Sequence, residues 1–117
     1  MTELWKHAQI VNKMVLTIEQ IKETVQDYFK DKPVKKVFLF GSYARNEAAN
    51  ESDVDLLIDL DKTQKIDWSI LGWSGDLQKK FQNNVDVITN VEKPEHTSNW
   101  NFIKRINKEK FLLYEKQ

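Results

Sequence analysis

The stretch FGSYARNEAANESDVDLLIDL, residues Phe40–Leu60, decides the fold. The continuous apolar run Val37–Phe40 leads into it, and such a run, bounded by turn residues, predicts a strand buried on both faces. At the other end, Val54–Leu60 predicts a second strand. The polar segment between them predicts a short helix over Ala44–Ala49. The stretch therefore consists of two strands joined by a compact polar connection.

Helices are predicted around these two strands. Thr17, followed by Gln20 three residues later, matches a capping box and starts a helix that Pro33 ends. A further helix is predicted over Asp67–Phe81, with Ile70, Leu71, either Trp73 or Ser74, Leu77 and Phe81 on its inner side. The remaining predicted elements are a strand over Val85–Thr89, a helix over Ser98–Lys110, and a short extended piece or helix end at Phe111–Tyr114. We expect a single α/β domain over residues 17–117, preceded by a leader, residues 1–16, with room for a short helix.

Composition excludes several classes of protein. The 117 residues carry 18 Lys+Arg and 18 Asp+Glu, and this zero net charge argues against a domain that binds nucleic acid by itself. No apolar run approaches the length of a membrane span, and no secretory signal pattern is present. The absence of cysteine excludes thiolate zinc sites, and with only two histidines we do not expect a histidine-rich metal site or a histidine-based triad. We expect a cytoplasmic protein whose chemistry depends on carboxylates, hydroxyls and backbone groups.

Gly41 and Ser42 follow directly on the first buried strand. Ligands commonly bind at the carboxyl ends of strands in α/β sheets. Glycine lets a phosphate approach the backbone closely, and a serine hydroxyl with the N–H groups of a following helix can donate to its oxygens. The turn is therefore a candidate phosphate-binding element. Arg45, three residues later, is either a phosphate contact or one partner of a surface salt bridge.

Three aspartates form the second part of the candidate site. Asp53 and Asp55 open the second predicted strand and project to one side, because strand side chains alternate. Asp86 interrupts the otherwise apolar third strand, where an acidic side chain costs free energy unless it has a partner or a function. Carboxylates that share a face repel each other unless a cation lies between them, and hard oxygen ligands suit Mg²⁺ together with substrate phosphates.

Together these residues predict a phosphoryl-transfer site. Two divalent ions about 3.5–4 Å apart can hold the attacking and leaving oxygens of an in-line displacement. In this scheme Asp53 and Asp55 bind both ions. Asp86 binds only the ion that activates the attacking hydroxyl, and it can accept the proton of that hydroxyl. Gly41 and Ser42 anchor the triphosphate.

The sequence resembles a known family at these positions. Gly41-Ser42, ten residues, then Asp53-x-Asp55 matches the signature of nucleotidyltransferases related to DNA polymerase β. The surrounding FGSYAR…SDVDLLIDL looks like the minimal nucleotidyltransferase (MNT) subfamily. The likeness covers residues 17–90 and returns in the closing INKEKFLLYE. Asp86 matches the third carboxylate of the family, and Arg45 a position that is commonly basic. At Asn46 the family often has glycine; asparagine tolerates the same left-handed backbone.

The resemblance implies a mixed β-sheet flanked by helices, and Mg²⁺-dependent transfer of AMP from ATP to an acceptor hydroxyl. MNT proteins are often encoded beside a ribonuclease toxin of the HEPN family, and some adenylylate it. A partner-modifying antitoxin is therefore the first hypothesis. An antitoxin that works mainly by binding its partner is the alternative, and a transferase acting on a small molecule is the third. An exposed Trp68, near the start of a predicted helix, would indicate a partner surface.

Overall fold

The computed structural model describes residues 15–89 and 100–116. Thr17 caps the first helix as predicted: its side chain accepts from the Gln20 N–H at 3.0 Å, and the Gln20 side chain accepts from the Thr17 N–H at 2.8 Å. Within the described residues, no helix is both long and apolar enough to cross a membrane. In chain order the elements are α2 (Ile18–Phe29), β1 (Val34–Phe40), α3 (Gly41–Ala44), β2 (Val54–Leu60), the 3-10 helix η1 (Trp68–Gly72), α4 (Trp73–Phe81), β3 (Val85–Thr89), α5 (Trp100–Glu109) and β4 (Phe111–Glu115).

The strands of the described chain form one mixed sheet in the order β3-β2-β1-β4. β1 pairs antiparallel with both β2 and β4, whereas β2 pairs parallel with β3 through the crossover that contains η1 and α4. The closing segment Phe111–Tyr114 is therefore a strand, which settles the choice that the sequence left open. This mixed sheet with helices confirms the predicted fold class.

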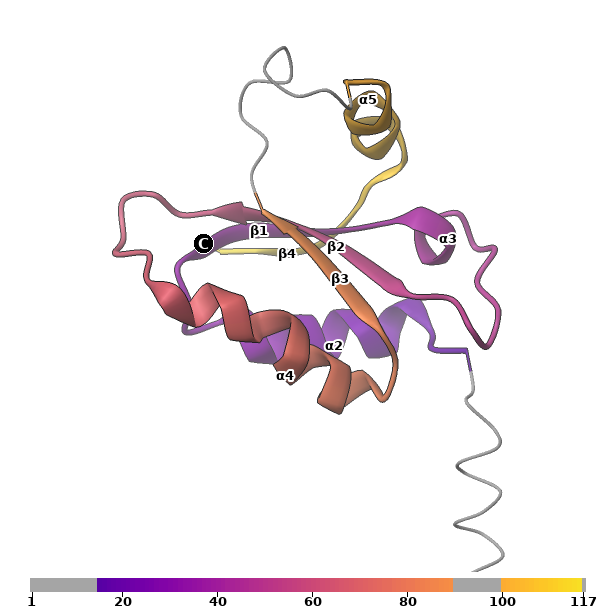
Figure 1. The fold of residues 1–117 in the computed structure, drawn as a ribbon, viewed down its shortest axis with the longest axis horizontal. Helices are drawn as coiled ribbons and strands as arrows, with labels where there is room; N and C mark the ends of the chain where they lie inside the picture. The colour runs from indigo at the N-terminus through magenta and orange to yellow at the C-terminus, as the bar shows by residue number, and fades with distance from the viewer. Residues whose placement is uncertain (1–14, 90–99, 117) are drawn as a thin grey trace, which may run out of the picture.

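Helices α2 and α4 cover one face of the sheet, and α5 lies over the other (Figure 1). The side chains of Val54, Leu56 and Ile58 alternate toward α2 and α4, where they are completely buried. On the opposite face a smaller apolar cluster joins Phe40 at the end of β1 to Ile106 of α5, with Leu57 and Ile88 packed against it. The sheet is thus packed fully on one side, and α5 covers part of the other.

Two predictions about local structure are wrong. The short helix predicted over Ala44–Ala49 instead occupies Gly41–Ala44. It ends early because Asn46 adopts a left-handed backbone with φ 60°, and the Glu47 N–H then bonds back to the Ser42 carbonyl at 2.8 Å. The left-handed Asn46 agrees with the tolerance expected of asparagine there.

The predicted helix over Asp67–Phe81 begins as the 3-10 helix η1 and continues as α4. Leu71 was predicted to face the core, but its side chain is 76% exposed, because the tighter 3-10 turn rotates it away from the α-helical stripe. Trp73 is buried and Trp68 is 85% exposed. The predicted leader lies outside the described residues except for Val15 and Leu16; Leu16 packs against the core. The boundary at residue 17 stays a prediction.

Trp73 and Trp68 provide a matched test of the core. Trp73 packs edge-on against Phe29, with ring centroids 5.3 Å apart, and fills the space between α4 and α2. We expect Trp73→Ala to lower the free energy of unfolding by about 3–5 kcal/mol. Trp68→Ala should change it by no more than about 0.5 kcal/mol, because that side chain is in solvent. Urea unfolding measures both, and equal losses would contradict this packing.

Candidate active site

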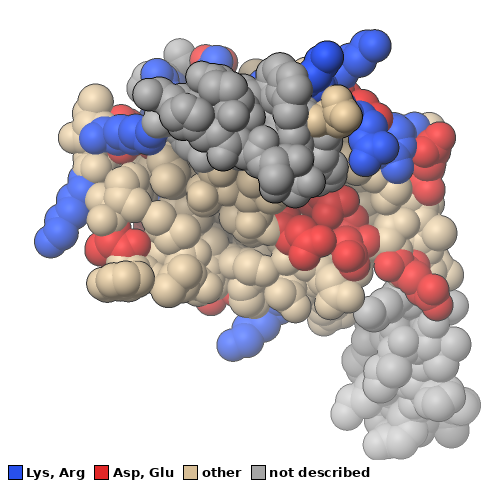
Figure 2. All heavy atoms as spheres, turned by 45° about the horizontal axis from the view of Figure 1, so that its top comes forward, with Lys and Arg blue, Asp and Glu red and all other residues tan. Residues whose placement is uncertain are grey.

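The candidate site is built on the parallel pairing of β2 and β3. In this register Asp55 stands directly opposite Asp86, with Val54 opposite Val85 and Leu56 opposite Val87 on either side. Those valines and Leu56 point into the core, so the two aspartates point to the other face, the side of α5. Two residues that are 31 positions apart in the sequence are therefore brought to one point. Figure 2 shows acidic side chains gathered on this side of the molecule, with lysine and arginine side chains beside them.

The electrostatics of Asp55 reflect this crowding. The pKa of Asp55 is raised to about 6. Burial is the largest cause, followed by repulsion from Asp86, a hydrogen bond with Asp86 and repulsion from Asp53, while the Arg45 charge opposes the rise. Asp55 is half-buried, whereas Asp86 is exposed on the edge strand β3. A carboxyl that holds its proton this strongly is typical of a functional site.

Gly41 brings the Gly-Ser turn against the same carboxylate. Its φ of 76° is accessible to few residues other than glycine, and a Cβ atom there would collide with the carboxylate of Asp55. Phe40, the residue before it, is the register partner of Asp55 across β1 and β2. The extended chain thus turns into α3 at the place where Asp55 projects. Ser42 follows as the second residue of α3 and is half-buried.

Arg45 connects this turn to α5. Its Nε donates to Glu47 Oε1 at 2.8 Å, and its Nη1 donates to Glu109 Oε2 at 3.1 Å. These two carboxylates raise the pKa of Arg45. Sequence reasoning left Arg45 between a phosphate contact and a salt bridge, and it missed both glutamates. No signal in the sequence identifies Glu109, because a helical pattern does not reveal which residue of α5 meets α3.

The structure brings together most of the predicted site. Asp55, Asp86 and Gly41 converge, and Asp53 and Arg45 lie close enough for their charges to act on Asp55. Among the residues that the structure describes, no group of three or more His, Cys, Asp or Glu side chains is arranged to hold a metal ion. The carboxylates therefore do not form a complete cage, and an ion here would need further oxygen ligands.

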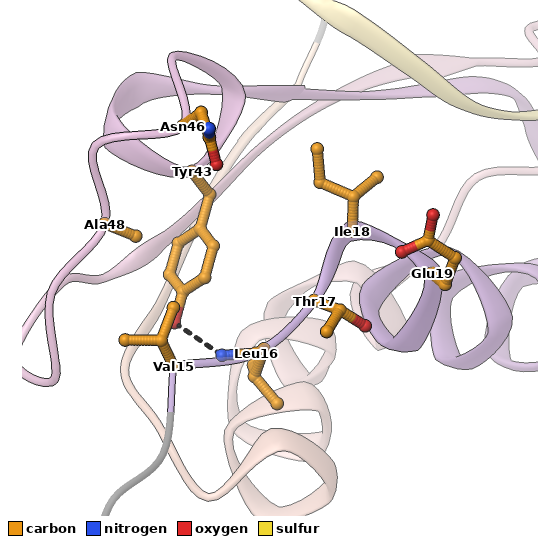
Figure 3. Close-up of a pocket in the computed structure, with 8 residues that line it drawn as sticks. All are labelled: Val15, Leu16, Thr17, Ile18, Glu19, Tyr43, Asn46 and Ala48. Carbon is orange, nitrogen blue, oxygen red and sulfur yellow. Dashed lines mark hydrogen bonds between the residues drawn. The ribbon is translucent and has the colours of Figure 1, made fainter.

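A pocket of about 360 Å³ lies between the start of α2 and the segment that contains Tyr43, Asn46 and Ala48 (Figure 3). It is lined by Val15, Leu16, Thr17, Ile18, Glu19, Tyr43, Asn46 and Ala48. The buried Tyr43 points into the molecule, and its hydroxyl accepts a hydrogen bond from the Leu16 N–H at 3.3 Å. This contact joins α3 to the start of α2. None of the predicted site residues lines the pocket.

The described chain is thus a mixed sheet that places a Gly-Ser turn beside two strand carboxylates, an arrangement that a phosphoryl-transfer protein could use. The sequence profile described as "Nucleotidyltransferase domain" matches residues 18–114. The chain belongs to this nucleotidyltransferase family.

Individual relatives agree with that assignment. A Methanocaldococcus jannaschii protein, named provisionally as a protein adenylyltransferase, is 38% identical over 78 residues, which cover 62% of this chain and 78% of the relative. A solved toxin–antitoxin structure with AMP-PNP matches 87% of this chain and 76% of its own, with TM-score 0.59 and 19% identity. Another, a tri-AMPylated HEPN toxin of Shewanella oneidensis with its MNT antitoxin, matches 86% and 75%, with TM-score 0.57 and 16% identity. At these identities the two structures show the shared fold.

Gly41 and Gly75 are a matched pair for testing the turn. We expect Gly41→Ala to destabilise the protein by at least about 1–2 kcal/mol, because alanine resists the left-handed backbone and its Cβ meets the Asp55 carboxylate. Gly75→Ala, in the helix α4 with open space at its Cβ position, should stabilise by about 0.5–1 kcal/mol. Thermal and urea unfolding measure both signs. A neutral Gly41→Ala would contradict the contact between Gly41 and Asp55.

The raised pKa of Asp55 predicts a pH-dependent stability without metal or nucleotide. Because the folded-state pKa of about 6 lies above the unfolded value of about 3.9, the protonated carboxyl favours folding, and this stability is lost as the pH rises between those values. The free energy of unfolding of Asp55→Asn should therefore equal that of wild type near pH 4 and exceed it by about 1 kcal/mol at pH 7. This figure allows for solvent screening, because the group is half-exposed. Unfolding curves in EDTA across this range test it, and parallel profiles for the two proteins would contradict it.

Proposed function

We propose that the protein transfers AMP from ATP to a hydroxyl group on a partner protein of the HEPN toxin type, and so acts as an antitoxin. The observation that carries this proposal is the meeting of Asp55, Asp86 and Gly41 at one place. The name of the Methanocaldococcus relative and the description of the AMPylated toxin complex support the choice of a protein acceptor. Because ATP is the proposed donor, we expect the reaction in the cytoplasm.

Mg²⁺ fits this donor set. Mg²⁺ is usually held by one or two carboxylates together with substrate phosphates and water, so the pair Asp55 and Asp86 with Asp53 nearby is sufficient once a triphosphate supplies oxygens. Burial raises the pKa of Asp55, and repulsion from Asp86 adds to the rise; a cation between the two carboxylates would relieve that repulsion. Bound there, one or two Mg²⁺ ions would neutralise the developing charge and lower the pKa of the attacking hydroxyl.

The residues of the turn hold the nucleotide. The Gly41 backbone has no Cβ to obstruct the phosphates, and the Ser42 hydroxyl and the N–H groups of α3 can donate to phosphate oxygens. The Arg45 guanidinium adds positive charge at the same place. These groups orient the triphosphate so that the α-phosphorus faces the acceptor.

The transfer itself forms one bond and breaks one. The acceptor oxygen bonds to the α-phosphorus while the bond from that phosphorus to the oxygen leading to the β-phosphate breaks, and pyrophosphate leaves with the electron pair. The hydroxyl proton moves to Asp86, the most exposed of the three aspartates, from which it passes to water. Asp86 stands on the edge strand, where an acceptor on a second protein can approach.

A second function, neutralisation by binding alone, is favoured by one surface feature. Trp68 and Leu71 are three residues apart on η1, and in a 3-10 helix such residues lie on the same side. Their side chains are 85% and 76% exposed, which is unusual for a tryptophan and a leucine together. In Figure 1 the connection from β2 to α4, which contains η1, lies at the opposite end of the sheet from α3. A partner docked on this pair would therefore lie away from the carboxylates.

Asp86→Asn separates the two functions. With the HEPN-type partner, ATP and Mg²⁺, wild type should add adenylyl groups to the partner, seen as a mass increase by mass spectrometry. Asp86→Asn should lower this rate by about 100-fold or more, because the proton acceptor is lost. Association with the partner, measured by size-exclusion chromatography, should persist.

The control is Trp68→Ala, which leaves every proposed site residue unchanged. If Asp86→Asn neutralises the partner as well as wild type without any mass increase in either case, while Trp68→Ala does not neutralise it, binding is the function and the transfer proposal is wrong.

A further inference from the structure

We propose that Glu109, the last residue of α5, is a positioning residue that holds the Arg45 guanidinium in place to receive the nucleotide phosphates. This inference rests on the proposed function, and it assigns a task to a helix that contributes none of the predicted site residues. Glu109 acts through Arg45.

The geometry of the ion pair supports a positioning role. Glu109 Oε2 lies 3.1 Å from Arg45 Nη1, and the Glu109 side chain is only 24% exposed, while that of Arg45 is 41% exposed. The second partner, Glu47, is two residues along the same loop and 65% exposed. Exposed pairs of neighbouring residues contribute little, whereas a partly buried carboxylate from a separate element fixes the direction of a guanidinium. Glu109 is therefore the more effective of the two carboxylates.

The bridge also connects the short helix α3 to α5. α3 is four residues long, and no side chain caps its start; Arg45 is its C-terminal cap. α5 is placed over the sheet by the packing of Ile106 with Phe40, the residue immediately before Gly41. Glu109, which forms the ion pair, follows Ile106 by about one helical turn along α5. Apolar packing and ion pair together set α5 against both ends of the short helix that contains Ser42.

The position of Arg45 matters because it caps the short helix α3. That helix begins at Gly41, which lies directly against the Asp55 carboxylate, one of the proposed metal ligands. An arginine side chain has many rotamers, and ordering it during ligand binding costs free energy. A guanidinium already held on two edges, at Nε by Glu47 and at Nη1 by Glu109, avoids much of this cost. Its remaining nitrogen, Nη2, can then donate to a phosphate oxygen.

Calorimetry on the full chain tests the proposal without any acceptor, using AMP-PNP with Mg²⁺ as the probe. Glu109→Gln should weaken binding about tenfold, because the charge-assisted hydrogen bond to Arg45 is lost. Arg45→Ala should weaken it at least as much. The double variant should bind no worse than Arg45→Ala alone, because Glu109 acts through Arg45. Glu109→Asp, which keeps the charge, should recover part of the affinity.

Glu115→Gln is the matched control. Glu115 Oε2, on β4, lies 3.7 Å from Lys36 Nζ of β1 in a salt bridge away from the site, so this variant should bind as wild type. Melting curves identify any variant that has lost its fold, and Glu109→Asp then replaces Glu109→Gln. Affinity of the folded Glu109 variant within twofold of wild type, or losses that add fully in the double variant, would overturn the positioning role. If wild type itself fails to bind the probe, the proposed function fails, and this inference with it.

Discussion

The register between β2 and β3 is the constraint on which the rest of the structure depends. It places Asp55 opposite Asp86, and it does so because Val54 and Leu56 on one strand and Val85 and Val87 on the other must face the core together. A slip of one residue would move the aspartates into the apolar face. Burial of these aliphatic residues thus forces two carboxylates together, and burial of Asp55, followed by repulsion from Asp86, raises the pKa of Asp55.

The remaining elements position groups around this pair. β1 pairs with β2 so that Phe40 lies opposite Asp55, and Gly41 then turns the chain so close to this carboxylate that a Cβ atom would collide with it. Tyr43 anchors the turn to the start of α2 from below. From the other side Arg45 reaches Glu109 of α5. The Gly-Ser turn is therefore supported on both sides, although the helix that contains it has only four residues.

Sequence reasoning predicted the sheet, and the structure brings Asp55, Asp86 and Gly41 together as expected, whereas their roles stay a prediction. Buried strands, the Thr17 capping box and the Gly-Ser and aspartate spacing are local patterns, and the structure follows them. The errors arose where local patterns compete. Ala44–Ala49 has helix-forming composition, but the left-handed Asn46 ends the helix. Leu71 fits an α-helical stripe, but η1 is a 3-10 helix that turns it outward. The Glu109 contact joins residues 64 positions apart and leaves no local trace.

We propose one ion-and-nucleotide site between the Gly-Ser turn and the paired aspartates. The most direct test uses Mn²⁺ in place of Mg²⁺ with AMP-PNP and records paramagnetic broadening of backbone amide signals in the isotope-labelled protein. The account predicts selective broadening at Gly41, Ser42, Asp55 and Asp86, with Thr17 and Leu113 affected far less. Broadening centred elsewhere on the molecule, or none at saturating AMP-PNP and Mn²⁺, would contradict it.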